Sequence, residues 1–443
     1  MKKILLSLIT ILMPLALLAQ QAGDNFTIKT TDGKTTEWSL AGDSKNGDIS
    51  TIKHKSNQLI LYAKGYEGIE WATYDIDKIE SITFNVFHKG SYVEESAAQA
   101  VKNMGIGTNF GNCTDVVAMW MNMNSNSVTD FEKAWGQEPT TKPMVDFLKK
   151  NGFNSVRIPV TWFQHMKEDG TVDEAWMNRI QEIVDYVIDN GMYCILNVHH
   201  DTGADDEKVK HWIKADEANY KENKEKFEYL WTQIATRFKN YDHHLVFEGY
   251  NEMLDADNTW NAPKSASSYK GLNGYAQSFV NAVRATGGNN ETRNLIVNTY
   301  AAANGDEVLN NLTIPTDKVE GHIAVEVHTY APWDWFAQKG KWDASCSNEI
   351  KNMFTRLNNK FISKGIPCII GEYGTHGSKS VSKNSSASEI QAAADQAADI
   401  VKQAKAYGVA TFYWMSIFSE KDRTVPQWTL PTVVEAMKKA YNE

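Results

Sequence analysis

The chain has 443 residues, of which 42% are hydrophobic and 23% are charged, a balance that excludes a disordered or collagen-like protein and allows a sizeable core. Asp and Glu total 55 against 45 Lys and Arg, so the formal charge is −10 and a nucleic-acid partner is not expected. The 14 Trp and 18 Tyr residues either pack the core or provide flat surfaces for ligands.

The first 19 residues have the pattern of a secretory signal peptide. Lys2 and Lys3 precede an apolar run, residues 4–18, which is interrupted by Pro14 and followed by Ala19. This run is too short and too interrupted for a membrane-spanning helix. We therefore predict export with cleavage near Ala19, to the periplasm, the cell surface or the medium. No later stretch is apolar enough to span a bilayer.

Residues 22–93 differ in composition from the rest and predict a small β-rich module. They are rich in Thr, Lys and Asp, contain the turn signal Asp32-Gly33, and alternate in hydrophobicity at Ile82, Phe84 and Val86. The segment has no cluster of carboxylates and aromatics that would mark a site. A ligand-binding module and a spacer both remain open.

From residue 96 to the C-terminus, short apolar runs alternate with amphipathic helices. Pro143 is expected to begin one helix and Asp173 to cap a second, while Phe227 and Trp231 share the apolar face of a third. The runs number eight, at residues 104–108, 155–160, 193–198, 245–250, 295–297, 323–327, 368–370 and 410–413. Eight such units predict a (β/α)₈ barrel, a TIM barrel, over residues 96–443.

Polar and aromatic residues gather at or just after the ends of these runs. In a (β/α)₈ barrel these strand ends share one rim, where catalytic groups normally lie. Seven of the eight strands deliver such a residue, which packing alone does not explain. The candidates are Asn109, Asn112, Arg157, His199, His200, Asp201, Asn251, Glu252, His328, Tyr330, Glu372 and Trp414.

Glu252 and Glu372 are the strongest catalytic candidates. They follow the fourth and seventh strands, and two carboxyl groups on one rim can divide the roles of acid and nucleophile. Arg157 beside Glu372 would keep it ionised, whereas Glu252 would have a raised pKa and act as general acid and then base. Either glutamate alone could instead be structural. Glu248 is expected to lie deeper, as a partner inside the barrel.

Two alternatives concern cysteines and metals. Cys113 and Cys346 are expected in loops and could pair in an oxidising compartment, whereas Cys194 and Cys368 are expected to be buried free thiols. The His199-His200-Asp201 run could bind a metal together with His328 and Glu372. Hydrogen bonding of a ligand is the favoured use of these residues, and we expect no metal and no cofactor.

The motifs at the strand ends resemble glycoside hydrolase family 5, the cellulase A family, and within it the endoglucanase and xyloglucanase branch. The likeness runs from about residue 104 to the C-terminus and rests on GIGTNFGN, VRIPVTW, ILNVHHD, FEGYNE, VHTYAPW, IIGEYG and FYWM. It implies a (β/α)₈ fold and metal-free hydrolysis with retention of configuration. Thr108 and Ser416 depart from the residues usual in the family, and both are expected to line the cleft.

The resemblance also implies roles for individual residues. Glu252 resembles the acid/base, Glu372 the nucleophile, and Arg157 and Tyr330 the partners of the nucleophile. Further residues resemble groups that contact the sugar or the acid, namely Asn251, His199, His328 and Trp414. Other aromatics near strand ends are expected to be sugar-stacking platforms, namely Trp162, Trp260, Trp333 and Trp335, whereas Trp176 and Trp231 are expected in the core.

These observations predict an exported, monomeric endo-β-1,4-glucanase that acts on a polysaccharide. Xyloglucanase, mixed-linkage glucanase and β-mannanase are alternatives with the same mechanism. A non-catalytic glycan-binding protein would lack one of the two glutamates, and both are present. A metal-dependent hydrolase would lose its activity when a chelator is added.

Overall fold

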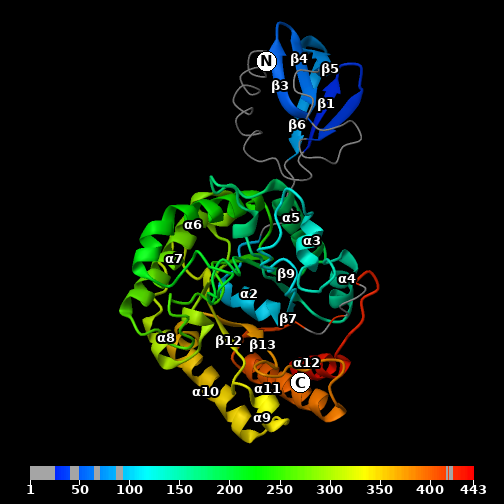
Figure 1. The fold of residues 1–443 in the computed structure, drawn as a ribbon. Coiled ribbons are helices and arrows are strands. Elements are labelled where there is room, and N and C mark those ends of the chain that lie inside the picture. The colour runs from blue at the N-terminus through cyan, green and yellow to red at the C-terminus, as the bar shows by residue number, and fades with distance from the viewer. Residues whose placement is uncertain (1–24, 40–48, 64–69, 86–92, 416–417, 419–422) are drawn as a thin grey trace. The chain divides into compact units, whose positions relative to one another are not determined.

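The structure is a computed structural model that describes residues 25–39, 49–63, 70–85, 93–415, 418 and 423–443. The chain divides into two compact units, one N-terminal and one that holds nearly all residues from 92 onward (Figure 1). The predicted signal peptide and Ser416 lie outside the described residues.

The N-terminal unit contains two three-stranded antiparallel sheets, in the orders β2-β1-β6 and β3-β4-β5. Asp32-Gly33 forms the predicted turn between β1 and β2, with Gly33 at a positive φ of 84°. Phe26, Ile28 and Leu61 belong to its buried core. The strands are β1 (Asn25–Thr30), β2 (Thr35–Ser39), β3 (Ile49–Lys55), β4 (Gln58–Ala63), β5 (Glu70–Asp75) and β6 (Ile79–Asn85), with η1 (Ile76–Lys78) before the last.

The second unit is a closed barrel of eight parallel strands, as predicted. Each strand pairs with its sequence neighbours, and β14 returns to pair with β7. The strands correspond to the eight apolar runs, and several differ from them by one to three residues at an end. They are β7 (Ile106–Asn109), β8 (Ser155–Ile158), β9 (Tyr193–Asn197), β10 (Leu245–Glu248), β11 (Leu295–Asn298), β12 (Ile323–Thr329), β13 (Cys368–Tyr373) and β14 (Ala410–Tyr413).

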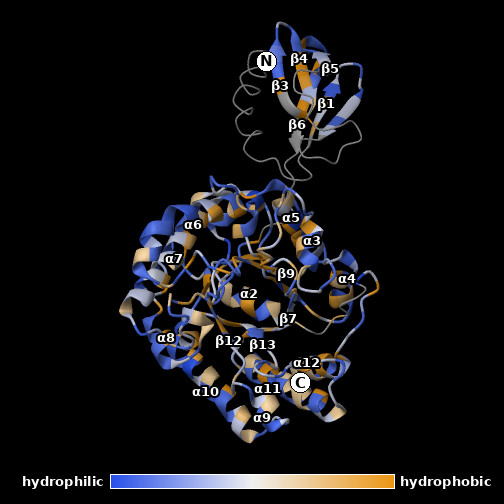
Figure 2. Cartoon of the chain, in the orientation of Figure 1, coloured by the Kyte–Doolittle hydropathy of each residue, from blue (hydrophilic) through white to orange (hydrophobic). Residues whose placement is uncertain are grey.

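Helices surround the barrel and turn hydrophilic faces outward, most visibly at α6 and α7 (Figure 2). Asp173 caps α5 through hydrogen bonds from two backbone N–H groups, as its sequence position predicts. The helices are α2 (Ala97–Met104), α3 (Val128–Lys133), α4 (Lys142–Lys150), α5 (Glu174–Ile188), α6 (Glu217–Phe238), α7 (Ala266–Ala285), α8 (Asp306–Asn311), α9 (Trp335–Lys339), α10 (Ala344–Lys360), α11 (Ala387–Ala406) and α12 (Pro431–Asn442). Short 3₁₀ turns are η2 (Phe163–His165), η3 (Gly288–Glu291), η4 (Tyr300–Ala302) and η5 (Ile362–Lys364).

The barrel interior changes from apolar to polar along the strands. Near the strand starts, apolar side chains form one buried cluster with α2, among them Ile195, Val246, Ile296 and Ala324. Because side chains on one face of a strand recur every second residue, the next inward positions are occupied by Asn197, Glu248, Asn298 and Glu326. All four are fully buried. The apolar layer stabilises the barrel, and the polar layer lies directly beneath the strand ends.

The cysteine prediction is wrong in part. Cys194 and Cys368 are buried and free, as expected, but Cys346 lies in the first turn of α10 rather than in a loop. Cys113 is also buried and free, and its sulfur accepts a hydrogen bond from Arg423 Nη1 at 2.8 Å. The two thiols are therefore not paired. Among the described residues, no helix is long and apolar enough to cross a membrane.

Candidate active site

A cavity of about 810 Å³ opens at the carboxyl ends of the barrel strands. Because all eight strands are parallel, side chains that follow β9, β10, β12, β13 and β14 meet there, although they are far apart in the sequence. The cavity is lined by ten of the predicted site residues: His199, His200, Asn251, Glu252, His328, Tyr330, Glu372, Trp260, Trp333 and Trp414.

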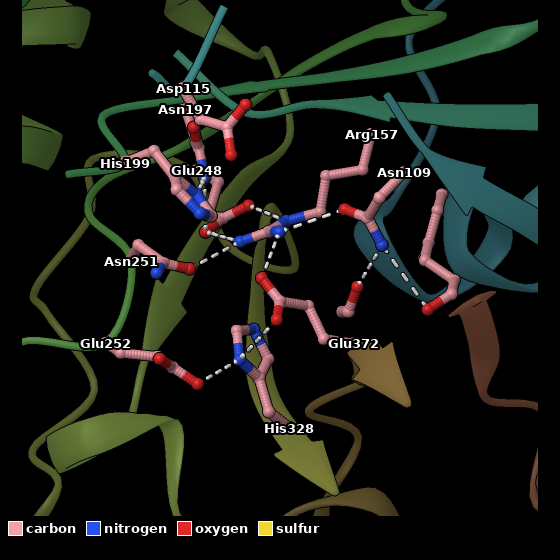
Figure 3. Close-up of polar contacts among 12 residues, drawn as sticks. Asn109, Asp115, Arg157, Asn197, His199, Glu248, Asn251, Glu252, His328 and Glu372 are labelled. Atoms are coloured by element: carbon pink, nitrogen blue, oxygen red, sulfur yellow. Dashed lines mark hydrogen bonds and ion pairs between the residues drawn. The ribbon is translucent and has the colours of Figure 1, made fainter. Parts of the chain in front are cut away.

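Arg157 on β8 is the centre of a buried hydrogen-bond network (Figure 3). Its Nε and Nη2 donate to both oxygens of Glu248 at 2.7 Å, in a bidentate ion pair. Its Nη1 donates to Glu372 Oε1 at 2.8 Å, and Nη2 also donates to the side-chain oxygen of Asn251 at 2.8 Å. The guanidinium thus fixes the carboxylate of Glu372 on β13 and the side-chain amide of Asn251, the residue before Glu252. The predicted interior role of Glu248 is confirmed.

Glu252 and Glu372 point toward one another across His328 (Figure 3). One carboxylate oxygen of each and a ring nitrogen of His328 all lie within 4.8 Å of one another. His328 Nδ1 is 2.8 Å from Glu252 Oε1 and 3.6 Å from Glu372 Oε2. The hydroxyl of Tyr330 donates to Glu372 Oε2 at 2.7 Å. Such a short separation between two carboxyl groups is the one that retaining glycosidases use.

The electrostatics of this group depend on burial and on the two cations. Burial raises the pKa of Glu372 above its ordinary value, while His328 and Arg157 oppose that rise. We expected Arg157 to keep the pKa of Glu372 low; the direction of its effect is confirmed, but burial outweighs it. Burial alone would lower the pKa of His328, but Glu372 and Glu252 carboxylates beside it raise it to about 10. His328 is therefore an imidazolium.

His199, His200 and Trp414 form a second part of the cavity wall. The rings of His199 and Trp414 lie nearly parallel, with centroids 5.8 Å apart. Burial lowers the pKa of His199 well below its ordinary value and that of His200 to about 4, so both rings are neutral hydrogen-bonding groups. A flat indole face next to neutral polar rings suits a sugar ring, which has an apolar face and a polar edge.

The predicted metal-ligand set is not brought together as expected. His199 and His200 group with Asp115, whereas His328 and Glu372 group with Glu252. Metal ligands must be deprotonated, and His328 carries a proton over the whole neutral range. The two carboxylates of the second group hold the proton of His328, and a metal ion that bound there would have to displace this proton.

Four aromatic or polar residues predicted near the strand ends are buried and do not line the cavity. Trp162 is fully buried and donates its indole N–H to the Asn197 carbonyl, and Trp335 is buried in the first turn of α9. Neither can stack on a ligand in the cavity. Asn109 and Thr108 are buried inside the barrel, where Asn109 accepts a hydrogen bond from Arg157.

Four other tryptophans lie where the sequence predicts them, two at the cavity and two in the core. Trp333 and Trp260 line the cavity, with 64% and 50% of their surfaces exposed, respectively. Trp176 and Trp231 are buried in the core, as expected. Exposure thus separates the tryptophans that line the cavity from those in the core, a property that strand-end position alone does not give.

Two buried acids near the site, Glu326 and Asp115, were not predicted from the sequence. Glu326 lies two residues before His328, and its Oε1 is 3.2 Å from His328 Nε2. Asp115 follows β7, and burial raises its pKa to about 7. The sequence does contain a signal for Glu326, since it is the one acid within the apolar run 323–327. A charged residue buried in a barrel strand needs a charged or hydrogen-bonding partner, and this need predicts a polar contact inside the barrel.

Replacement of Arg157 by Leu is expected to reduce the free energy of unfolding by about 3–5 kcal/mol at neutral pH, because it leaves buried carboxylates without their cation. Arg157 opposes the raised pKa of Glu326, so without Arg157 that pKa would rise further in the folded state, and the loss should shrink as pH falls and Glu326 binds a proton. Urea unfolding at two pH values measures this. Arg356→Leu is the control, since Arg356 bonds only to neutral oxygens of Asn304 in the described structure and its deficit should not depend on pH.

Comparison with protein families supplies the identification. Residues 113–419 match the model of cellulase, glycosyl hydrolase family 5. The chain belongs to glycosyl hydrolase family 5. The prediction of a retaining glycoside hydrolase with a (β/α)₈ barrel is therefore confirmed.

Relatives of this family 5 enzyme agree with the assignment. It is 35% identical to the cellulase/esterase CelE of Acetivibrio thermocellus, over 77% of this chain and 40% of that protein, so the chain spans less than half of that relative. It is 33% identical to endoglucanase 1 of Ruminococcus albus, over 84% of this chain and 88% of that protein.

Solved structures are also similar. A family 5 glycoside hydrolase from Prevotella bryantii B14, a mutant in complex with a xyloglucan tetradecasaccharide, is 56% identical with a TM-score of 0.76, covering 80% of this chain and all of that one. A broad-specificity endoglucanase from an uncultured bacterium is 44% identical with a TM-score of 0.74, covering 80% and 98%.

Proposed function

We propose that this family 5 enzyme is an exported endo-β-1,4-glucanase in which Glu372 is the nucleophile and Glu252 the acid/base. The observation that carries the proposal is the approach of the two carboxylates within 4.8 Å around His328. The names of the relatives as endoglucanases support the substrate class. Lys2, Lys3 and the apolar run after them support export.

In the first step, a carboxylate oxygen of Glu372 forms a bond to the anomeric carbon as the bond to the leaving oxygen breaks. Glu252 gives its proton to that leaving oxygen. In the second step, water attacks the same carbon, its proton passes to Glu252, and the ester bond to Glu372 breaks. Arg157 and Tyr330 hold the two oxygens of Glu372 in place during both steps.

Xyloglucan is the second candidate substrate. Ala301, Ala302 and Ala303 line the cavity, and such small side chains leave volume beside a bound glucan chain for a branching sugar. The Prevotella bryantii neighbour binds a xyloglucan oligosaccharide, which supports the same idea.

A polysaccharide panel tests both candidates. Carboxymethyl cellulose, mixed-linkage glucan, xyloglucan and mannan would be digested with and without a chelator, and the products sized. We expect internal cleavage of the glucans, little action on mannan, and no effect of the chelator. Release of single sugars from chain ends, or the absence of glucan hydrolysis, would contradict the proposal.

Trp333→Ala is expected to raise the KM for soluble glucan about fivefold with a much smaller change in kcat, because a lost stacking surface is worth roughly 1 kcal/mol. Trp333 lines the cavity with most of its surface exposed. Initial rates over a range of glucan concentrations measure the effect. Tyr229→Ala is the control, as Tyr229 is an exposed aromatic on α6 outside the cavity.

A further inference from the structure

Glu326 is a fully buried acid directly beneath the proposed catalytic pair. It lies on β12, two residues before His328, so both side chains leave the same face of the strand. Its Oε1 is 3.2 Å from His328 Nε2 and 3.3 Å from Arg157 Nε. The mechanism proposed above does not use this carboxyl group.

Glu326 fits against Gly371, the residue that precedes the proposed nucleophile. A Cβ at position 371 would lie 1.8 Å from Glu326 Oε1, so no other residue fits there without displacing this carboxyl group. Glu326 pairs in register with Ile369 on β13, so two rigid strands fix its position. The carboxyl group is therefore built into the barrel next to Glu372.

When Glu252 and Glu326 are both ionised, the contacts of His328 require two N–H groups. Nδ1 lies 2.8 Å from Glu252 Oε1, and Nε2 lies 3.2 Å from Glu326 Oε1. A neutral imidazole has only one N–H, so only the protonated ring donates to both carboxylates. The other charged groups facing it are Glu372 and Arg157, and His199 nearby is neutral.

We propose that Glu326 is a positioning residue that keeps His328 protonated through both steps of the reaction. The inference rests on the proposed roles of Glu252 and Glu372. When Glu372 forms an ester it loses its negative charge, and the positive His328 is then balanced by Glu252 and Glu326 alone. The Nδ1–H of a charged His328 donates to Glu252 Oε1 at that point, and this contact stabilises the carboxylate with which Glu252 acts as a base.

The effect of Glu326 should grow as pH rises. Burial and the neighbouring Glu248 raise the pKa of Glu326 to about 7, while Arg157 and His328 oppose that rise. Below that value Glu326 is mostly neutral, and above it the carboxylate is charged. The carboxylate thus acts in the pH range in which an isolated imidazole would have lost its proton.

The test is the pH dependence of Glu326→Gln. Glutamine keeps the shape and one acceptor oxygen but lacks the charge. We expect its kcat/KM on soluble glucan, relative to that of the unchanged enzyme, to fall about tenfold between about pH 5.5 and about pH 8.5. Glu132→Gln is the matched control, because Glu132 is also fully buried and pairs with an arginine, Arg179, away from the cavity. Its relative rate should be the same at all pH values.

A relative rate of Glu326→Gln that stays constant with pH would reduce Glu326 to a structural role and overturn the inference. Should this variant fail to fold, nitrogen NMR of the unchanged enzyme decides, with the His328 signals assigned by their loss in His328→Gln. We expect both ring nitrogens of His328 to stay protonated at about pH 8, whereas titration near the ordinary value of about 6.5 would refute the idea. Failure of the unchanged enzyme to cleave any glucan would instead defeat the proposed function.

Discussion

Replacement of Glu372 by Gln is expected to lower kcat on a soluble cellulose derivative by about 10⁴-fold or more, because an amide cannot form the glycosyl ester. Glutamine is close to glutamate in size, and its amide can still meet Arg157 and Tyr330, which contact the two oxygens of the carboxylate. The fold should therefore survive. Reducing-sugar release, measured over several hours at high enzyme concentration, quantifies the residual rate.

Glu132→Gln is the control for this variant. Glu132 resembles Glu372 in being a buried glutamate that is paired with an arginine, but it lies on α3 and pairs with Arg179 on α5, rather than at the strand ends. Its loss should lower stability while leaving kcat per folded molecule unchanged. A Glu372→Gln variant that keeps near-normal kcat would show that another group attacks the sugar.

The barrel and the rim could be predicted because both follow from local patterns. Apolar runs of three to six residues between amphipathic helices define a (β/α)₈ barrel, and the parallel strand order places every strand end on one rim. The positions of Arg157, Glu252, His328 and Glu372 follow from this geometry alone. Their roles as catalytic or supporting groups remain proposals.

Side-chain direction and depth could not be predicted in the same way. Trp162 and Trp333 both follow strands, but one turns into the core and donates to a backbone carbonyl, and the other faces the cavity. Loop conformation decides between these outcomes, and no short-range pattern encodes it. The net direction of the Glu372 pKa shift was also missed, because burial of a carboxyl group depends on packing around the whole rim.

Glu252→Ala should separate the acid/base role from that of the nucleophile. We expect kcat on polysaccharide to fall about 10³- to 10⁴-fold, because proton transfer to the leaving oxygen is lost. With an aryl glycoside that has an acidic leaving group, the first step needs no proton. The glycosyl ester on Glu372 should then accumulate, since no base activates water, and a burst of the released phenol measures this.

Added azide tests whether Glu252→Ala is slow because it lacks a base. As an anion it attacks the ester without a base, so it should restore turnover in Glu252→Ala and yield a glycosyl azide of the original configuration. The same treatment should not restore Glu372→Gln by that route, because no ester forms there. If azide restored turnover in neither variant, the assigned roles would be contradicted. His328 contacts both carboxylates. Each variant therefore removes one of the two negative charges that balance the positive charge of His328 and leaves the other.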